Sequence, residues 1–159
     1  MSNLSNRASA QSIADQLIFP NTAFINGKFT GAKSGKTFQT INPANNELLT
    51  NISACDGSDV DLAVEKARKA FNNGGWSKMH PSDRKLVMIK LVKLMTRHRN
   101  TLAVLESLES GKPIKDCMDI DIPETLHCLA WHAESADKIY DQISPSGDDA
   151  VGMVVREPA

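Results

Sequence analysis

The chain has 159 residues, of which 41% are hydrophobic and 23% charged, and its formal net charge is −1. These are ordinary values for a globular domain, and a near-neutral chain offers no electrostatic reason to bind nucleic acid or an anionic membrane. The longest apolar stretch, residues 86–95, is interrupted by Lys90 and Lys93, and the polar N-terminus lacks a signal-peptide core, so we expect a cytoplasmic protein without a membrane span.

The first third of the chain predicts a short helix followed by β-strands. Residues 8–17 favour a helix that Pro20 ends, because proline cannot continue it. Asn26-Gly27 is a strong signal for a two-residue hairpin turn, since a type I′ turn needs positive φ at both central positions. A further turn and two strands follow at residues 33–36, 37–42 and 48–53. Together they predict a small antiparallel β-meander.

From Ser58 the hydrophobic period becomes helical. We expect Ser58 to be the N-cap, with Asp59 and Asp61 placing negative charge near the positive end of the helix dipole. Asn73, Gly74 and Gly75 stop this helix. Its apolar stripe is predicted to comprise Val60, Ala63, Val64, Ala67, Ala70 and Phe71.

Three more helices are predicted. One begins at Pro81 and one runs over about residues 100–109, ending at Gly111, while the third spans about residues 122–142. The buried side of the first comprises Leu86, Ile89, Leu91, Val92 and Met95, and a groove for a partner helix is the alternative to a core role.

The end of the chain breaks at residues 144–149 and then predicts a strand over residues 150–155. An isolated strand leaves unpaired backbone groups at its edge. We therefore expect its partner strand to come from another chain or from additional sequence.

Few residue groups carry chemistry. The odd number and wide spacing of Cys55, Cys117 and Cys128 argue against a disulfide framework. Cys128 and His132, four residues apart on a predicted helix, can touch. A zinc site or a Cys–His nucleophile are the sharper interpretations, but no further ligands stand nearby and Cys128 is in mid-helix, so packing or surface roles are favoured.

Two further clusters have plain explanations. A set of carboxylates clusters with two lysines, which favours a solvated patch at a helix start over an acid–base pair. Its members are Lys112, Lys115, Asp116, Asp119, Asp121 and Glu124. Gly74-Gly75 follows a helix rather than a strand, so it indicates a helix stop and not a phosphate cradle.

Several phrases occur together and in order along nearly the whole chain from Phe24 to Ala159. They are Phe24-Ile25-Asn26-Gly27-Lys28-Phe29, Thr40-Ile41-Asn42-Pro43-Ala44, Asp61-Leu62-Ala63-Val64, Ala67-Arg68-Lys69-Ala70-Phe71, Trp76, Leu105-Glu106-Ser107-Leu108-Glu109-Ser110-Gly111-Lys112-Pro113 and Val155-Arg156-Glu157-Pro158. This succession resembles the start of the NAD(P)-dependent aldehyde dehydrogenases. Residues 121–140 and 154–158 look most like the branch that oxidises γ-glutamyl-γ-aminobutyraldehyde in putrescine breakdown.

The resemblance implies an α/β family fold, of which this chain supplies a mainly helical part with an N-terminal β-meander and a C-terminal strand. In the family a cysteine thiolate attacks the aldehyde, hydride passes to NAD or NADP, and water activated by a glutamate hydrolyses the thioester. An asparagine helps to form the oxyanion hole. In the family's order all of these groups follow the Arg156-Glu157-Pro158 phrase. The resemblance therefore implies an N-terminal fragment that is inactive alone, with no catalytic residue and no tight cofactor site.

The resemblance also implies an organisation. Residues 1–21 form a tail with a short helix, residues 22–143 the N-terminal part of the cofactor-binding domain, and residues 144–159 the start of an oligomerisation β-arm. The expected partners are the rest of the enzyme and sister subunits, contacted through residues 144–158. The alternative is a non-catalytic helical interaction protein that retains the family's front segment.

One site carries over from the resemblance. Many family members bind a structural K⁺ or Na⁺ through carbonyls of the phrase that matches Thr40 and Ile41 and through an acidic residue that matches Glu109. Hard oxygen ligands suit such ions. Glu109 stands where aspartate is more usual, and its alternative role is that of a helix-end carboxylate.

Overall fold

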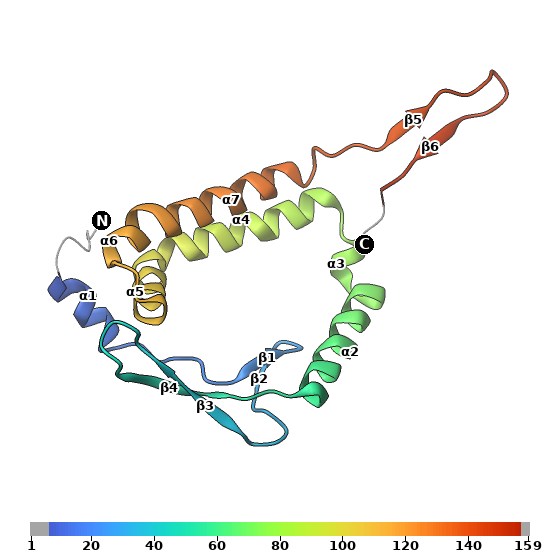
Figure 1. Cartoon of the computed structure of the whole chain (residues 1–159). Coiled ribbons are helices and arrows are strands. Elements are labelled where there is room, and N and C mark those ends of the chain that lie inside the picture. The colour runs from blue at the N-terminus through green and yellow to red at the C-terminus, as the bar shows by residue number, and fades with distance from the viewer. Residues whose placement is uncertain (1–6, 157–159) are drawn as a thin grey trace.

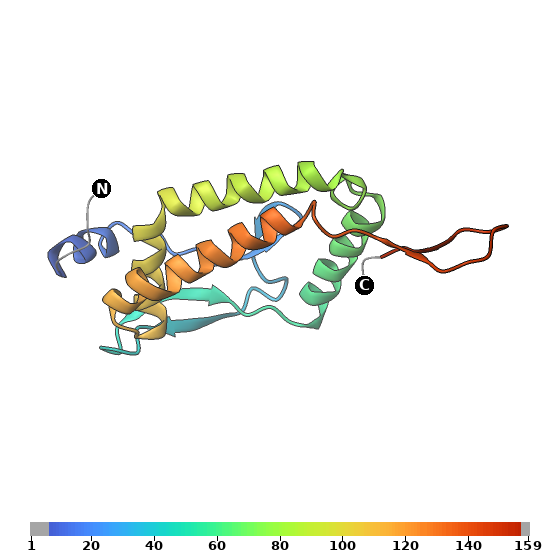
Figure 2. The ribbon, with the colours of Figure 1, turned by 90° about the horizontal axis from the view of Figure 1, so that it is seen from above.

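The computed structural model describes residues 7–156. Helices α4 (Pro81–Arg97) and α7 (Ile122–Ser135) lie side by side and run in opposite directions, and α5 (Arg99–Ser110) crosses one end of the pair (Figures 1 and 2). The remaining helices are α1 (Arg7–Ala14), α2 (Gly57–Asn73), α3 (Gly75–Lys78), α6 (Ile114–Asp116) and the π-helix η1 (Cys117–Asp121). Helices account for more of the chain than strands, which confirms the expected mainly helical arrangement. The strands are short and form antiparallel pairs.

Strands β1 (Ala23–Ile25) and β2 (Lys28–Thr30) form the predicted hairpin. Asn26 and Gly27 have φ angles of 52° and 77°, which is the positive φ at both central positions that a type I′ turn requires. Across the hairpin the rings of Phe24 and Phe29 meet edge to face, with 5.1 Å between their centroids. Turn chemistry and a cross-strand aromatic pair thus fix the same register.

The antiparallel strands of the predicted β-meander form, but as two separate hairpins. Strand β3 (Thr37–Ile41) pairs with β4 (Leu48–Ser53), and within residues 7–156 each strand pair is a separate two-stranded sheet. The segment between β2 and β3 makes other bonds, because the backbone N–H of Lys33 donates to Oδ1 of Asp59 at 3.0 Å and its Nζ donates to the Ser58 carbonyl at 2.9 Å. These donors face the start of α2, so the segment does not extend the ladder.

Helix α2 is capped by Asp56, and the prediction of Ser58 as N-cap is wrong. The Asp56 carboxylate accepts from the N–H of Ser58 at 2.9 Å, while Oδ2 of Asp59 accepts from the N–H of Asp56 at 3.0 Å. This reciprocal arrangement is a capping box, with aspartate in both roles. Gly74 ends the helix, as predicted.

The helices that follow begin where expected, and α5 also ends as predicted, whereas the last helix ends earlier. Pro81 occupies the first turn of α4, and Gly111, with φ of 75°, ends α5 in the left-handed conformation. The last predicted helix is preceded by α6 and η1, and α7 ends at Ser135 rather than near Gln142. Pro123 stands in the first turn of α7, two residues after η1, where a residue that has no N–H to donate is tolerated.

The terminal strand finds its partner inside the chain. Strand β6 (Gly152–Val154) pairs antiparallel with β5 (Gln142–Ser144), and Ile143 lies opposite Met153. The expectation that the partner comes from another chain or from additional sequence is therefore wrong. The hairpin extends away from the helices in both views (Figures 1 and 2).

The described residues bury few apolar side chains. The buried ones are Ala103, Val104, Cys117 and Ala133. The stripe predicted for α2 is open, since Val60 and Val64 are 56% and 59% exposed, and Leu86 of α4 is 56% exposed. Helix faces that the sequence assigns to a core are thus partly solvated in this chain. None of the helices within residues 7–156 is long and apolar enough to cross a membrane.

Candidate functional site

The predicted cation site lies where β3 meets the end of α5. Strand pairing is irregular between Thr40 and Ile41, so the regular ladder of carbonyls and amides is interrupted at these two residues. On the other element, Glu109 is exposed in the last turn of α5.

The turn after β3 holds the two segments of this site together. Asn42 is buried, its Oδ1 accepts from the N–H of Ala44 at 2.9 Å, and its own N–H donates to the Glu47 carbonyl at 2.8 Å. Gly111 packs so closely on this turn that a Cβ there would lie 2.8 Å from Cγ of Pro43. The structure therefore brings the two segments of the predicted site into contact.

The carboxylate patch consists of ion pairs. Nζ of Lys112 lies 2.6 Å from Oδ1 of Asp121, and Nζ of Lys115 lies 2.8 Å from Oδ2 of Asp119. Each hydrogen bond to its carboxylate raises the pKa of the lysine. Lysines that stay charged hold these carboxylates as counter-ions, which supports the solvated patch over an acid–base pair.

Cys117 is enclosed beside this patch at 0% exposure. Burial raises the pKa of its thiol, and the nearby charge of Asp121 raises that pKa further. Because the thiolate is the nucleophilic form of cysteine, Cys117 is poorly suited to attack a carbonyl.

The predicted contact between Cys128 and His132 is confirmed, with 3.6 Å between Sγ and Nδ1. The same Nδ1 lies 2.8 Å from the Cys128 carbonyl, which can only accept, so Nδ1 donates to the backbone of its own helix. Within the described part of the chain, no three His, Cys, Asp or Glu side chains gather as a metal site. The pair therefore has the geometry of an ordinary helix-surface contact.

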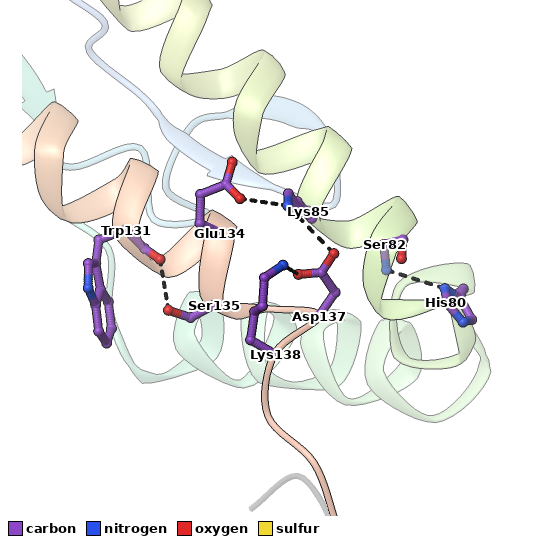
Figure 3. Close-up of polar contacts among 8 residues, drawn as sticks. All are labelled: His80, Ser82, Lys85, Trp131, Glu134, Ser135, Asp137 and Lys138. Carbon is purple, nitrogen blue, oxygen red and sulfur yellow. Dashed lines mark hydrogen bonds and ion pairs between the residues drawn. The ribbon is translucent and has the colours of Figure 1, made fainter.

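A polar cluster between α4 and the end of α7 was not predicted from the sequence. Lys85 of α4 extends its Nζ to Glu134 at 2.6 Å and to Asp137 at 3.5 Å, and Asp137 also pairs with Lys138 at 2.5 Å (Figure 3). The hydrogen bond with Glu134 raises the pKa of Lys85, and the hydrogen bond from Lys138 lowers the pKa of Asp137. We call these four residues the Lys85 cluster.

Local sequence carries no signal for the Lys85 cluster. One side comes from α4 and the other from the end of α7 and the turn after it, far away in the chain, so only the packing of α4 on α7 joins them. The neighbouring bonds in Figure 3 are local caps: Nδ1 of His80 accepts from the N–H of Ser82 at 3.3 Å, and Oγ of Ser135 donates to the Trp131 carbonyl at 2.9 Å.

The described residues do not form a dinucleotide cradle. Such a site needs a glycine turn between a strand and a helix, at the edge of a parallel sheet. Gly74 and Gly75 instead follow α2, and the strand pairs within residues 7–156 are antiparallel. The residues present therefore do not fit NAD or NADP.

Comparison with known proteins gives a consistent result. Residues 29–159 match the aldehyde dehydrogenase family. Aminoacetaldehyde dehydrogenase from Pseudomonas aeruginosa is 48% identical over 158 residues, which are 99% of this chain and 32% of that protein. The NADP/NAD-dependent aldehyde dehydrogenase PuuC from Escherichia coli is 38% identical over 148 residues, which are 93% of this chain and 30% of that protein.

Solved structures agree with the sequence relatives. The aldehyde dehydrogenase KauB from Pseudomonas aeruginosa matches with a TM-score of 0.93 and 39% identity, over 96% of this chain and 31% of that one. Gamma-glutamyl-gamma-aminobutyraldehyde dehydrogenase from Burkholderia cenocepacia matches with a TM-score of 0.92 and 37% identity, over 95% and 31%. The chain spans about a third of the length of the relatives it matches.

Proposed function

This chain belongs to the aldehyde dehydrogenase family, and we propose on that basis that it is one part of an enzyme that oxidises an aldehyde to its carboxylate with NAD or NADP. The single observation that carries this proposal is the 48% identity to an aminoacetaldehyde dehydrogenase over almost the whole chain. Similarity to this enzyme and to a γ-glutamyl-γ-aminobutyraldehyde dehydrogenase supports an aminoaldehyde as the substrate class. We also propose a role in putrescine breakdown, which rests on the resemblance of residues 121–140 and 154–158.

We propose further that these 159 residues do not turn over aldehyde by themselves. Cys117 is enclosed with a raised thiol pKa, and the described residues do not fit the dinucleotide. Their role is that of a scaffold: α2, α4 and α7 present exposed apolar side chains for further sequence to cover, and the β5–β6 hairpin presents a ribbon.

The test compares the chain alone with a chimera that joins it to the remaining segment of the Pseudomonas aeruginosa aminoacetaldehyde dehydrogenase. Both are incubated with aminoacetaldehyde and either NAD⁺ or NADP⁺, and absorbance of the reduced cofactor is followed. We expect turnover by the chimera and none by the chain alone. Turnover by the chain alone would contradict its proposed inactivity, and a folded chimera without activity would contradict the proposed enzyme.

A second candidate function is that of a non-catalytic interaction protein. The observation that favours it is the exposure of large apolar side chains on the helices, including 62% for Trp131. The chimera assay distinguishes the two functions. If the chain is part of an enzyme, the chimera should oxidise the aldehyde, whereas a non-catalytic interaction protein should give a chimera without turnover.

Residues 144–158 are the proposed contact to the rest of the enzyme and to sister subunits. The described portion of this segment and β5 expose Ile143, Val151 and Met153, each by more than two thirds, and the ribbon has two edges free to pair. Glu157 and Pro158 lie outside the described residues. Sedimentation velocity of the chain tests the proposal, and a strictly monomeric wild type would contradict self-association through the hairpin.

Thr40, Ile41 and Glu109 are the proposed ligands of a monovalent cation, through two carbonyls and one carboxylate. The interrupted strand pairing at Thr40 and the close packing of Gly111 on Pro43 support the site. We expect thermal stability to rise with K⁺ or Na⁺ relative to choline at equal ionic strength, and Glu109→Gln to reduce that rise. Glu106→Gln, on the exposed surface of the same helix, is the matched control. Equal stability in choline would contradict the site.

A further inference from the structure

Lys85 of α4 contacts both the last turn of α7 and the segment that follows α7. Its partner Glu134 belongs to the last turn of α7, whereas Asp137 stands beyond the helix end in the turn formed by residues 136–138 (Figure 3). We call residues 136–141 the exit turn, because the chain leaves α7 through them and enters β5 at Gln142. One ammonium group on α4 therefore holds both the helix and the exit turn.

The exit turn has little else to fix its shape. Its backbone bonds are single-turn contacts, from the N–H of Ala136 to the Ala133 carbonyl at 3.3 Å and from the N–H of Lys138 to the Ser135 carbonyl at 3.0 Å. Such bonds at a helix end fray readily. The turn therefore depends on side-chain contacts for a fixed direction.

The exit turn determines the direction in which the β5–β6 hairpin extends. In Figures 1 and 2 the β5–β6 ribbon projects beyond the helices. At its base, Oδ1 of Asp141 accepts from the N–H of Arg156 at 3.1 Å, which ties the two legs of the ribbon to each other but not to a helix. The direction of the ribbon is thus set upstream of Asp141, where Lys85 contacts Asp137.

We propose that Lys85 is a positioning residue that holds the exit turn against α4 and so presents the β5–β6 hairpin to a sister subunit in one direction. The partner itself rests on the proposed function of residues 144–158. A ribbon held in its bound direction associates more tightly, because less freedom is lost on binding. The positive charge is required, since removing it leaves Glu134 and Asp137 facing each other with Lys138 as the remaining cation of the cluster.

Three variants test this inference. Lys85→Met removes the charge and keeps an apolar stem of similar length, whereas Lys85→Arg keeps the charge and should behave as wild type. The matched control is Lys115→Met, which breaks the ion pair with Asp119 on η1 and changes net charge equally. Amide hydrogen exchange, resolved by peptide, is measured for each.

In Lys85→Met we expect exchange over residues 136–146 to accelerate by roughly three- to tenfold, as loss of a partly exposed ion-pair cluster allows. Exchange in residues 122–132 and in α4 should remain unchanged, and Lys115→Met should leave residues 136–146 unchanged. No acceleration, or the same acceleration in Lys115→Met, would overturn the inference. A uniform acceleration across α4 and α7 would also overturn it, because Lys85 would then serve general helix packing.

Association is read separately. If the wild-type chain self-associates, Lys85→Met should weaken that association by a similar factor, and Lys85→Arg should associate as the wild type does. Unchanged association of Lys85→Met, together with faster exchange in the exit turn, would overturn the role of Lys85 in presenting the hairpin. A monomeric wild type would contradict the proposed partner, whereas the exchange result would still decide whether Lys85 holds the exit turn.

Discussion

The carboxylate of Asp59 accepts a hydrogen bond from the backbone N–H of Lys33 at 3.0 Å, across 26 residues of sequence. Its other oxygen completes the capping box of α2 through the N–H of Asp56. Only 4% of Asp59 is exposed, so both bonds are shielded from water. A single side chain thus caps a helix and anchors the segment that precedes β3.

Asp59→Ala should therefore destabilise the chain more than loss of an ordinary cap. Two backbone N–H groups lose their acceptor, and we expect a decrease of about 2 kcal/mol in the free energy of unfolding. Chemical denaturation followed by circular dichroism measures it. Asp61→Ala, on the exposed side of the same helix, is the control and should change stability by less than about 0.5 kcal/mol. Equal effects of the two substitutions would refute the double role of Asp59.

Gly111→Ala should be destabilising for two reasons. Its φ of 75° disfavours any side chain, and the new Cβ would lie 2.8 Å from Cγ of Pro43. We expect a loss of about 1–3 kcal/mol. Gly31→Ala is the matched control, because Gly31 has open space around it and no positive φ. If the cation site is formed as proposed, Gly111→Ala should also reduce the stabilisation by K⁺, because it pushes α5 away from the turn after β3.

The three thiols should differ in reactivity towards a disulfide reagent. Cys55 and Cys128 are exposed and should react in the native state, whereas the enclosed Cys117 should react only on unfolding. The raised pKa means that the Cys117 thiol stays protonated in the folded chain at a pH where it ionises in the unfolded chain. The free energy of unfolding should therefore fall as pH rises through that raised pKa. The rapid phase should be unchanged in Cys117→Ala. A rapid phase of three thiols in wild type would show that Cys117 is not enclosed.

Asp137 should titrate below an ordinary aspartate. The hydrogen bond from Lys138 is the largest cause of the lowered pKa, and the charges of Lys138 and Lys85 add to it. The stabilisation by its ionised form is present above the ordinary aspartate pKa and is lost as pH falls through the lowered value. Carboxyl-carbon NMR should show the midpoint rising in Lys138→Met and, by less, in Lys85→Met. A midpoint equal to that of the urea-unfolded chain would contradict the ion pairs.

The parts of this fold that were predictable are those set by neighbouring residues. Asn26-Gly27, Pro81 and Gly111 each impose a backbone conformation on their own position, so the turn and the helix limits followed from sequence. The N-cap of α2 is Asp56 and not Ser58. Sequence does not distinguish the two, because aspartate and serine are both good N-caps and they stand two residues apart.

The remaining features depend on tertiary contacts. The meander divides because Lys33 bonds to Asp59, and the Lys85 cluster exists because α4 packs on α7; neither pairing leaves a local pattern. For the candidate cation site, family resemblance supplied Thr40, Ile41 and Glu109. The contact of Gly111 with Pro43 that brings the two segments together became visible only in the structure.

The internal pairing of β5 with β6 has a consequence for the order of events during folding. Gln142 pairs with Val154, a short separation in sequence, and hairpins that close such short loops form within about 1–10 μs. The α4–α7 contact joins segments much farther apart, so closing that loop has a larger entropic cost. The β5–β6 hairpin is therefore able to form before α4 packs on α7. Destabilising changes in the helix layer should leave its local register intact.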